Sequence, residues 1–288
     1  MVAIYDRYTH TEYVYRGNMD TVRSQDFFAA NPVFTHEEFL ASRAEAAGRS
    51  TRTADTLLAQ HARAGRLLRV KRGLYASVPA GVTPAQFQAD PYLVATKASR
   101  DGVVAFHAAL QFRGKAYSVW HRYAVLTRSH LRPFGFQGNE FVGVRPPATL
   151  LAREDMGGGV VEEPHAGGTV RVTTLERTLV DLFDAPSHGG GWEEVWRSLE
   201  MVEFFDLGAV LTHVERLGSA LTAARVGFFL EQHREALFVE ERHLQPLRRL
   251  APRQARYLDR SRGPGKLVKG WNLVVPERVL ERSWAEVP

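Results

Sequence analysis

The segment from residue 35 to residue 78 constrains the fold most, because it combines closely spaced helix signals with a hairpin signal. Thr35 and Glu38 have the spacing of a capping box, in which the threonine hydroxyl accepts from the amide of residue 38 and the glutamate reaches back. This box predicts a helix over 36–47, followed by Gly48. Ser50-Thr51 then caps a further predicted helix, which ends at about Ala64.

Two short apolar runs, 67–70 and 74–78, follow these helices and flank Lys71-Arg72-Gly73. Glycine adopts the positive φ that a tight turn needs, so the runs predict a β-hairpin. An earlier short helix from Asp20 should end at Asn31-Pro32, because proline disfavours helix in the residue before it. Three short helices and a hairpin are typical of a winged helix-turn-helix, in which the third helix reads DNA and the hairpin contacts the backbone.

The third predicted helix has one apolar stripe and one polar face. Ala54, Leu57, Leu58 and either His61 or Ala62 have the spacing of a buried stripe. Arg and Gln on the other face can make bidentate contacts with bases, and Ser or Thr near the helix start can donate to phosphate. The alternative is a small helical subdomain with a solvated basic face. The predicted DNA-contacting residues are Arg49, Ser50, Arg52, Thr53, Thr56, Gln60, Arg63, Lys71 and Arg72.

Charge is distributed unevenly, although the formal net charge is only +5. Eight basic and two acidic residues lie between Arg43 and Arg72, and ten basic and four acidic residues lie between Arg234 and Lys269. The rest of the chain is acidic in sum. This distribution favours contact with a polyanion through the basic segments, and solvated helix faces are the alternative explanation.

The expected fold is α+β, with a winged helix-turn-helix followed by a mixed domain that has a small antiparallel sheet and a helical end. We expect an arm over 1–18, the winged helix over 19–78, a linker over 79–91 and a C-terminal domain over 92–288. Helices are predicted over 91–99, 104–112, 173–184, 192–204, 207–217, 221–236 and near 243–250, antiparallel strands within 119–145, two short strands within 157–174, and a last strand at 271–276.

The absence of cysteine excludes a disulfide framework, a thiolate zinc site and a cysteine nucleophile, and suits a reducing compartment. The N-terminal residues contain no apolar run of the signal-peptide kind, and no stretch approaches the ~18 apolar residues of a membrane span. We therefore expect a cytoplasmic protein.

Candidate enzyme sites are weak. Glu162, Glu163 and His165 lie among glycine and proline, which favours a solvated loop over a metal trio. His107, His121 and His130 lack metal-ligand spacing. Residues 263–266 resemble a phosphate loop poorly, because Leu267 stands where Ser or Thr would hold magnesium. We expect no catalytic residues, no metal and no cofactor, with a nuclease or kinase fused to the winged helix as the enzyme alternative.

Arg177 and Asp181 have the spacing of an ion pair on one helix. We expect this pair to tie the helix to the sheet, with a functional contact as the second interpretation.

Four sequence blocks carry a resemblance to a known family. They are FTHEEFLA with STRTADTLLAQHARAGRLLRVKRGLYA near the N-terminus, AFHAALQFRG at 105–114, VRVTTLERTLVDLF at 170–183 and ARVGFFLEQ at 224–232. In this order they resemble the AbiEi antitoxins of type IV toxin–antitoxin systems, which are also transcriptional regulators. Residues 1–18 have no place in this pattern.

The resemblance implies a two-domain protein that binds inverted repeats in the promoter of its own operon, represses that operon and takes part in phage defence. It also implies that the C-terminal domain neutralises a nucleotidyltransferase-like toxin, without necessarily holding it in a tight complex. The alternative is a winged-helix regulator whose C-terminal domain binds a ligand or dimerises.

The basic C-terminal segment leaves three interpretations open: a solvated face, a second DNA contact, or a surface for an acidic toxin. Arg249, Arg253, Arg256 and Arg260 would share one side of a helix, but Pro252 limits such a helix. We take these four arginines as the toxin-binding candidates.

Overall fold

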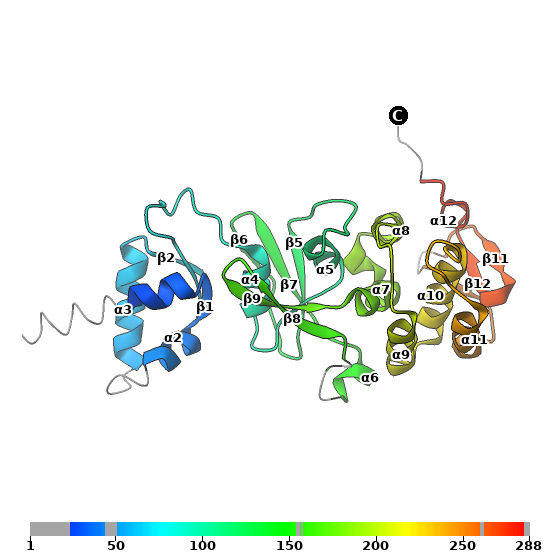
Figure 1. The fold of residues 1–288 in the computed structure, drawn as a ribbon, viewed down its shortest axis with the longest axis horizontal. Coiled ribbons are helices and arrows are strands. Elements are labelled where there is room, and N and C mark those ends of the chain that lie inside the picture. The colour runs from blue at the N-terminus through cyan, green and yellow to red at the C-terminus, as the bar shows by residue number, and fades with distance from the viewer. Residues whose placement is uncertain (1–23, 44–50, 154–155, 157, 260–261, 285–288) are drawn as a thin grey trace, which may run out of the picture. The chain divides into compact units, whose positions relative to one another are not determined.

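The computed structural model describes residues 24–43, 51–153, 156, 158–259 and 262–284 (Figure 1). It divides into two compact units: unit 1 comprises residues 1–98 and 164–170, and unit 2 comprises residues 99–163 and 171–288. The predicted arm over 1–18 lies outside the described residues.

Unit 1 begins with helices of the predicted kind. Residues 24–30 are helical, and α2 (His36–Arg43) follows strand β1 (Val33–Thr35) directly. The capping box is confirmed, because the Glu38 amide donates to the Thr35 hydroxyl over 3.2 Å and the Thr35 amide donates to the Glu38 carboxylate over 2.8 Å. The predicted continuation of α2 to residue 47 lies outside the described residues.

The second half of unit 1 contains α3 (Thr51–Arg63) and the predicted hairpin of β2 (Leu67–Lys71) and β3 (Leu74–Ser77). Gly73 has a φ of 77° at the turn, as the hairpin requires. The antiparallel strands are ordered β1-β3-β2. Aromatic side chains dominate the core beneath them, which comprises Phe28, Phe34 and Phe39 with Ala54, Leu58 and Leu67.

Helix α4 (Pro91–Lys97) also belongs to unit 1. Asp90 caps it by accepting from the amides of Tyr92 and Leu93 at 2.9 Å. Residues 79–90 contain turns and no helix or strand, and the linker over 79–91 stays a prediction. Lys97 of α4 forms an ion pair with Glu38, so the segment after the linker is fastened to α2.

Unit 2 contains most of a mixed sheet with the order β6-β7-β5-β4-β9-β8, larger than the small antiparallel sheet predicted. Its strands are β4 (Val103–Val104), β5 (Arg122–Leu126), β6 (Phe134–Phe136), β7 (Asn139–Val144), β8 (Val160–His165) and β9 (Gly168–Thr173). The end of β8 and the start of β9 belong to unit 1.

Two strand predictions were wrong. Strands β5 and β7 pair in parallel, because the antiparallel β6–β7 hairpin places its second strand beside β5. Alternation within a strand shows which side chains share a face and not the direction of the neighbouring strand. Val103 and Val104 form a strand, and helix α5 starts only at His107 and runs to Phe112. A short apolar run does not distinguish a buried strand from a helix.

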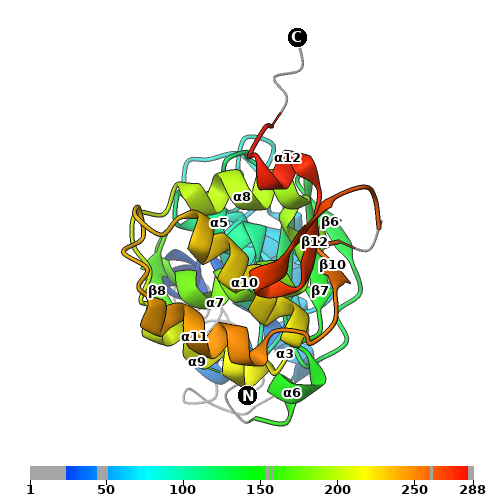
Figure 2. The ribbon, with the colours of Figure 1, turned by 90° about the vertical axis from the view of Figure 1, so that its right-hand side faces the viewer.

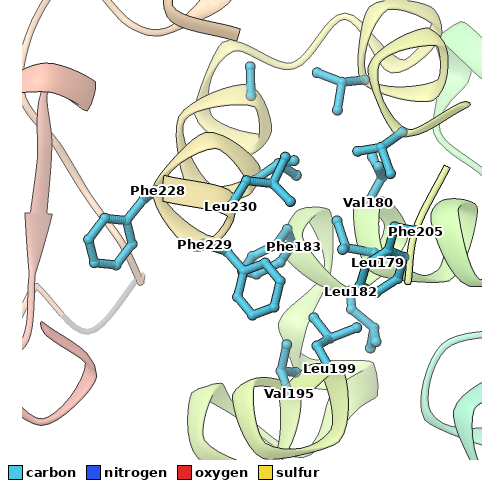
Figure 3. Packing of buried hydrophobic residues seen from close by; sticks show 14 of the residues in the cluster. Leu179, Val180, Leu182, Phe183, Val195, Leu199, Phe205, Phe228, Phe229 and Leu230 are labelled. Atoms are coloured by element: carbon cyan, nitrogen blue, oxygen red, sulfur yellow. The ribbon is translucent and has the colours of Figure 1, made fainter. Parts of the chain in front are cut away.

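Helices complete the core of unit 2. They are α6 (Ala148–Leu151), α7 (Leu175–Asp184), α8 (Trp192–Glu200), α9 (Leu207–Leu217), α10 (Ala220–Gln232), α11 (Glu241–Leu250) and α12 (Glu277–Leu280). Phe183 of α7 and Phe229 of α10 pack against each other with their ring centres 5.4 Å apart (Figure 3). Helix α7 starts two residues after the predicted start at residue 173, because Thr174 caps it: the Thr174 hydroxyl accepts from the Arg177 amide, whereas the Thr173 hydroxyl bonds to Thr178.

A second small sheet ends the described chain. Its strands β10 (Arg256–Tyr257), β11 (Lys266–Val268) and β12 (Leu273–Val275) have the order β10-β12-β11. Figure 2 shows these strands over α10. The fully buried Trp271, in the 3-10 turn before β12, packs against the bare backbone of Gly227 in α10. None of the described helices is both long and apolar enough to span a bilayer.

Candidate nucleic-acid interface

Helix α3 has the two faces that the sequence predicts. Ala54, Leu58 and His61 are buried, and Leu57 and Ala62 pack against the same core. The opposite face is exposed and carries Arg52, Thr53, Thr56, Gln60 and Arg63. Arg49 and Ser50 lie outside the described residues. The exposed face thus combines cations with a side-chain amide, the groups that contact phosphates and base edges.

Local contacts orient this face. The Thr56 hydroxyl donates to the Arg52 carbonyl over 2.8 Å, which leaves its lone pairs to accept from a ligand. Asp55 is the acidic residue of the face, and it lies 2.8 Å from His36 Nε2 on α2. This contact ties α2 to α3 and offsets part of the negative charge at Asp55 whenever His36 is protonated.

Lys71 and Arg72 are adjacent in the sequence, but their side chains have different surroundings at the hairpin turn. Arg72 is exposed at the turn, whereas the Lys71 ammonium donates to the Ala98 carbonyl over 2.5 Å at the end of α4. Burial lowers the pKa of Lys71, since desolvation disfavours its charged form. Lys71 is therefore engaged inside unit 1, and its predicted phosphate contact stays a prediction.

Sequence reasoning missed Arg69, which is exposed on β2 directly before the buried Val70. Strict alternation would place Arg69 on the face of Leu67, so it gave no signal. The register shift between Arg69 and Lys71 breaks the alternation, and Val70 is buried while Arg69 is exposed. Arg69 places a further cation on the strand that leads into the turn.

His61 belongs to the core side of α3. Its ring contacts Phe28 edge-on, with 4.8 Å between ring centres. Burial lowers the pKa of His61, and the positive charges of Arg66 and Arg43 lower it further. The neutral ring therefore belongs to the aromatic core rather than to the cationic surface.

The three side chains considered as a metal trio have separate partners, and the favoured solvated loop was wrong for the two glutamates. Glu162 and Glu163 lie on strand β8 rather than in a loop, so adjacent side chains point to opposite faces. Glu163 pairs with Arg113 at 2.9 Å, Glu162 approaches Arg171 at 3.7 Å, and His165 pairs with Asp90 at 2.8 Å. Within the described part of the chain, no three His, Asp or Glu side chains are grouped as metal ligands.

Three of the other candidate groups have partners within the protein, and His130 is exposed. His107 is buried, stacks on Trp120 and lies 2.9 Å from Glu194, and burial lowers its pKa. Lys266, in the segment that resembles a phosphate loop, pairs with Glu277 at 3.2 Å. His121 lies 3.2 Å from Asn139.

The predicted pair on α7 is confirmed. Arg177 Nε lies 3.1 Å from Asp181, and both side chains are buried. His213 of α9 lies 3.2 Å from the same carboxylate, and Arg177 also donates to the Gly158 carbonyl. The network therefore ties α7 to α9 and to the loop before β8.

The C-terminal arginines do not share a helix. Helix α11 ends at Leu250, two residues before Pro252. Arg249, Arg253 and Arg256 are all exposed, while Arg260 lies outside the described residues. Proline cannot donate the backbone bond that would continue the helix.

These features define a mixed α+β protein whose N-terminal unit presents a cationic helix face beside a hairpin, as nucleic-acid-binding regulators do. Residues 18–78 match the family described as transcriptional regulator, AbiEi antitoxin. This match confirms the resemblance over that segment and indicates a DNA-binding regulator.

Among solved structures, the chain is similar to the Rv2827c protein from Mycobacterium tuberculosis, with 18% sequence identity and a TM-score of 0.57. The similarity covers 90% of this chain and 91% of the other, and it concerns the fold alone. No curated protein matches the sequence.

Proposed function

We propose that unit 1 is a winged helix-turn-helix and that the protein represses its own operon by binding inverted repeats in the promoter. The observation that carries this proposal is the exposed face of α3, where Arg52, Gln60 and Arg63 lie on the segment that matches the regulator family. In this arrangement α3 enters the major groove, where Arg52 and Gln60 contact base edges.

The hairpin supplies backbone contacts in the same proposal. Arg72 and Arg69 are exposed and hold phosphates, which fixes the register of α3 without reading sequence. Lys71 positions the hairpin through its bond to Ala98. The position of the hairpin thus depends on α4 as well as on its own strands.

Unit 2 serves a second role in the proposal. It neutralises a nucleotidyltransferase-like toxin, as in type IV toxin–antitoxin systems and phage defence, and it is not an enzyme. Arg249, Arg253, Arg256 and Arg260 are the proposed contacts. The support is the family resemblance together with the exposure of the first three arginines.

DNA binding is tested by titrating the upstream inverted repeat with the full chain and its variants. Arg52→Ala should weaken cognate binding by ~1–3 kcal/mol and relax specificity at one base, whereas Arg72→Ala should weaken all sequences alike. Arg278→Ala removes an exposed arginine from α12 and serves as the matched control. Parent-like binding by both Arg52→Ala and Arg72→Ala would contradict the proposed interface.

Toxin neutralisation is tested by co-expressing the full chain with the neighbouring gene, which the proposal expects to encode a nucleotidyltransferase-like protein. Growth should stop with that gene alone and recover with both. Continued arrest in the presence of folded full chain would reject the antitoxin role and leave the DNA-binding role standing.

A further inference from the structure

Helix α3 carries a single acidic residue, Asp55, and its side chain is 66% exposed. Residues three and four apart lie on the same side of a helix, so Asp55 lies beside Arg52 and Ala59. Both of these residues are exposed as well. Asp55 therefore belongs to the surface of α3 that is proposed to meet DNA.

This carboxylate is unfavourable for contact with the DNA backbone. A negative side chain repels phosphates, whereas the exposed arginines of the same helix attract them. The pair of Asp55 with His36 gives little stability in return, because ion pairs between partly exposed groups contribute little to folding. Neither backbone contact nor stability accounts for an acid at this position, so contact with a base edge is the remaining role.

His36 fixes the direction of the Asp55 carboxylate. His36 Nε2 lies 2.8 Å from Oδ1 of Asp55. The His36 amide donates to the Gly73 carbonyl at the hairpin turn over 2.8 Å, so the backbone of His36 is held as well. Oδ2 of Asp55 has no hydrogen-bond partner among the described residues. One oxygen is thus anchored, and the other can accept from a ligand with little loss of side-chain freedom.

An anchored carboxylate oxygen discriminates among bases. An ionised carboxylate only accepts hydrogen bonds, so it cannot pair with O6 and N7 of guanine or with O4 of thymine. The donors in the major groove are the amino groups of cytosine and adenine, and that of adenine lies next to the N7 acceptor, which repels a carboxylate. The short side chain of Ala59 leaves room for a base edge to approach Asp55. Cytosine is therefore the base that fits this oxygen.

We propose that Asp55 is a specificity-determining residue, whose free oxygen accepts from the N4 amino group of a cytosine in each half-site of the promoter repeat. His36 is a positioning residue that orients this carboxylate from α2. This inference rests on the proposed function, in which α3 enters the major groove. Asp55 thereby disfavours the other bases at one position, and its charge weakens binding to unrelated DNA.

The test uses the full chain to select duplexes from a library in which the promoter repeat is randomised, and the bound fraction is sequenced. Asp55→Asn keeps the shape of the side chain but turns the free oxygen into an NH2 donor, which cannot pair with the amino group of cytosine. Asp55→Ala removes the acceptor. Glu215→Gln makes the same change in net charge at an exposed position of α9 and is the matched control. Circular dichroism reports whether each variant is folded.

We expect the parent to favour cytosine about tenfold over other bases at one position of each half-site. Asp55→Asn should exchange this preference for a base with a major-groove acceptor, while the other positions stay unchanged and Glu215→Gln selects like the parent. Asp55→Ala should lose the preference and bind random duplexes more tightly, because a repulsive charge is gone. The inference is overturned by a parent without any cytosine preference, or by folded Asp55→Asn that retains it.

A change in the DNA tests the same contact without relying on the folding of a variant. N4-methylcytosine at the selected position still pairs with guanine, but a methyl group replaces the hydrogen that points into the major groove. The methylated duplex should bind the parent about tenfold more weakly, and it should bind Asp55→Ala as the unmodified duplex does. Equal affinity of the parent for both duplexes contradicts the contact, and so does an equal loss in the parent and in Asp55→Ala.

Failure of the proposed function would give a different result. A parent that enriches no sequence from the library rejects promoter binding by α3 itself, whereas enrichment of the same sequence by the parent and by folded Asp55→Asn rejects only the role of Asp55. His36→Ala leaves Asp55 in place and should reduce the cytosine preference without changing the other positions. An unchanged preference in folded His36→Ala contradicts the positioning role of His36.

Discussion

His61 makes the stability of unit 1 depend on pH. Its folded pKa is lowered by burial and by two neighbouring arginines, whereas in the unfolded chain it is about 6.5. Below that pH the unfolded chain takes up a proton that the folded chain refuses. The free energy of unfolding therefore falls as pH drops below about 6.5, by at most ~1.4 kcal/mol per pH unit.

This prediction is measured by amide hydrogen exchange in peptides from residues 51–77, at pH 7.5 and 5.5 and corrected for intrinsic rates. The parent should lose protection at the lower pH. His61→Leu, which cannot be protonated, should lose much less. An equal loss in both proteins would show that another group controls the effect.

Asp181 is expected to be the most costly carboxylate to neutralise. Asp181→Asn keeps the volume but leaves the buried Arg177 without its anion, which should reduce the free energy of unfolding by ~3–5 kcal/mol. Trp192 and Trp196 pack on Phe183 of the same helix, so urea denaturation followed by tryptophan fluorescence reports the change. Glu193→Gln breaks the more exposed pair with Arg197 and should cost less than ~1 kcal/mol. An equal loss of stability in Asp181→Asn and Glu193→Gln would contradict a stabilising role for the buried pair.

Helix α10 has a glycine in its middle, Gly227, and the packing of Trp271 on this helix depends on it. A Cβ at Gly227 would lie 2.2 Å from two atoms of the Trp271 ring, which the bond to Glu231 holds in place. Gly227→Ala gains ~1 kcal/mol of helix propensity and loses ~1–3 kcal/mol to overpacking. We expect a net loss in stability, measured by urea denaturation. Gly208→Ala, at an exposed position of α9, is the control. A Gly227→Ala variant more stable than the parent would contradict the close packing of Trp271 on Gly227.

Elements with local signals at both ends could be predicted from the sequence. Helix α9 runs from Leu207 to Leu217 as predicted, because Asp206 caps its start and Gly218 adopts a φ of 70° at its end. The apolar stripe of α3 was likewise correct. Strand direction was not, since the parallel pairing of β5 with β7 depends on where the β6–β7 hairpin is inserted.

In the candidate interface, too, the sequence predicted local features and did not predict contacts between residues far apart in the chain. The exposure of Arg52, Gln60 and Arg63 follows from helical periodicity alone. The hydrogen bond from Lys71 to the Ala98 carbonyl joins residues 27 apart in sequence, so no local pattern predicts it. The scattering of Glu162, Glu163 and His165 to separate partners likewise depends on strand pairing.

Because the whole molecule divides into two units, the stability of each unit can be followed by a different measurement. Every tryptophan of the chain lies beyond residue 98 and outside 164–170, so tryptophan fluorescence follows unit 2, whereas hydrogen exchange can follow unit 1. The two proposed roles can therefore be tested in one full-length protein, without cutting the chain. Independent folding and activity of residues 92–288 stay a prediction.

The most direct test of the central claim is the salt dependence of promoter binding by the full chain. If four to six cations of the α3 face and hairpin contact phosphates, the logarithm of the binding constant should fall with the logarithm of salt concentration at a slope of about −4 to −5 for one protomer. Two protomers on an inverted repeat should roughly double that slope. Arg72→Ala should make it shallower by about one. A slope near zero in the parent would contradict DNA binding by this surface.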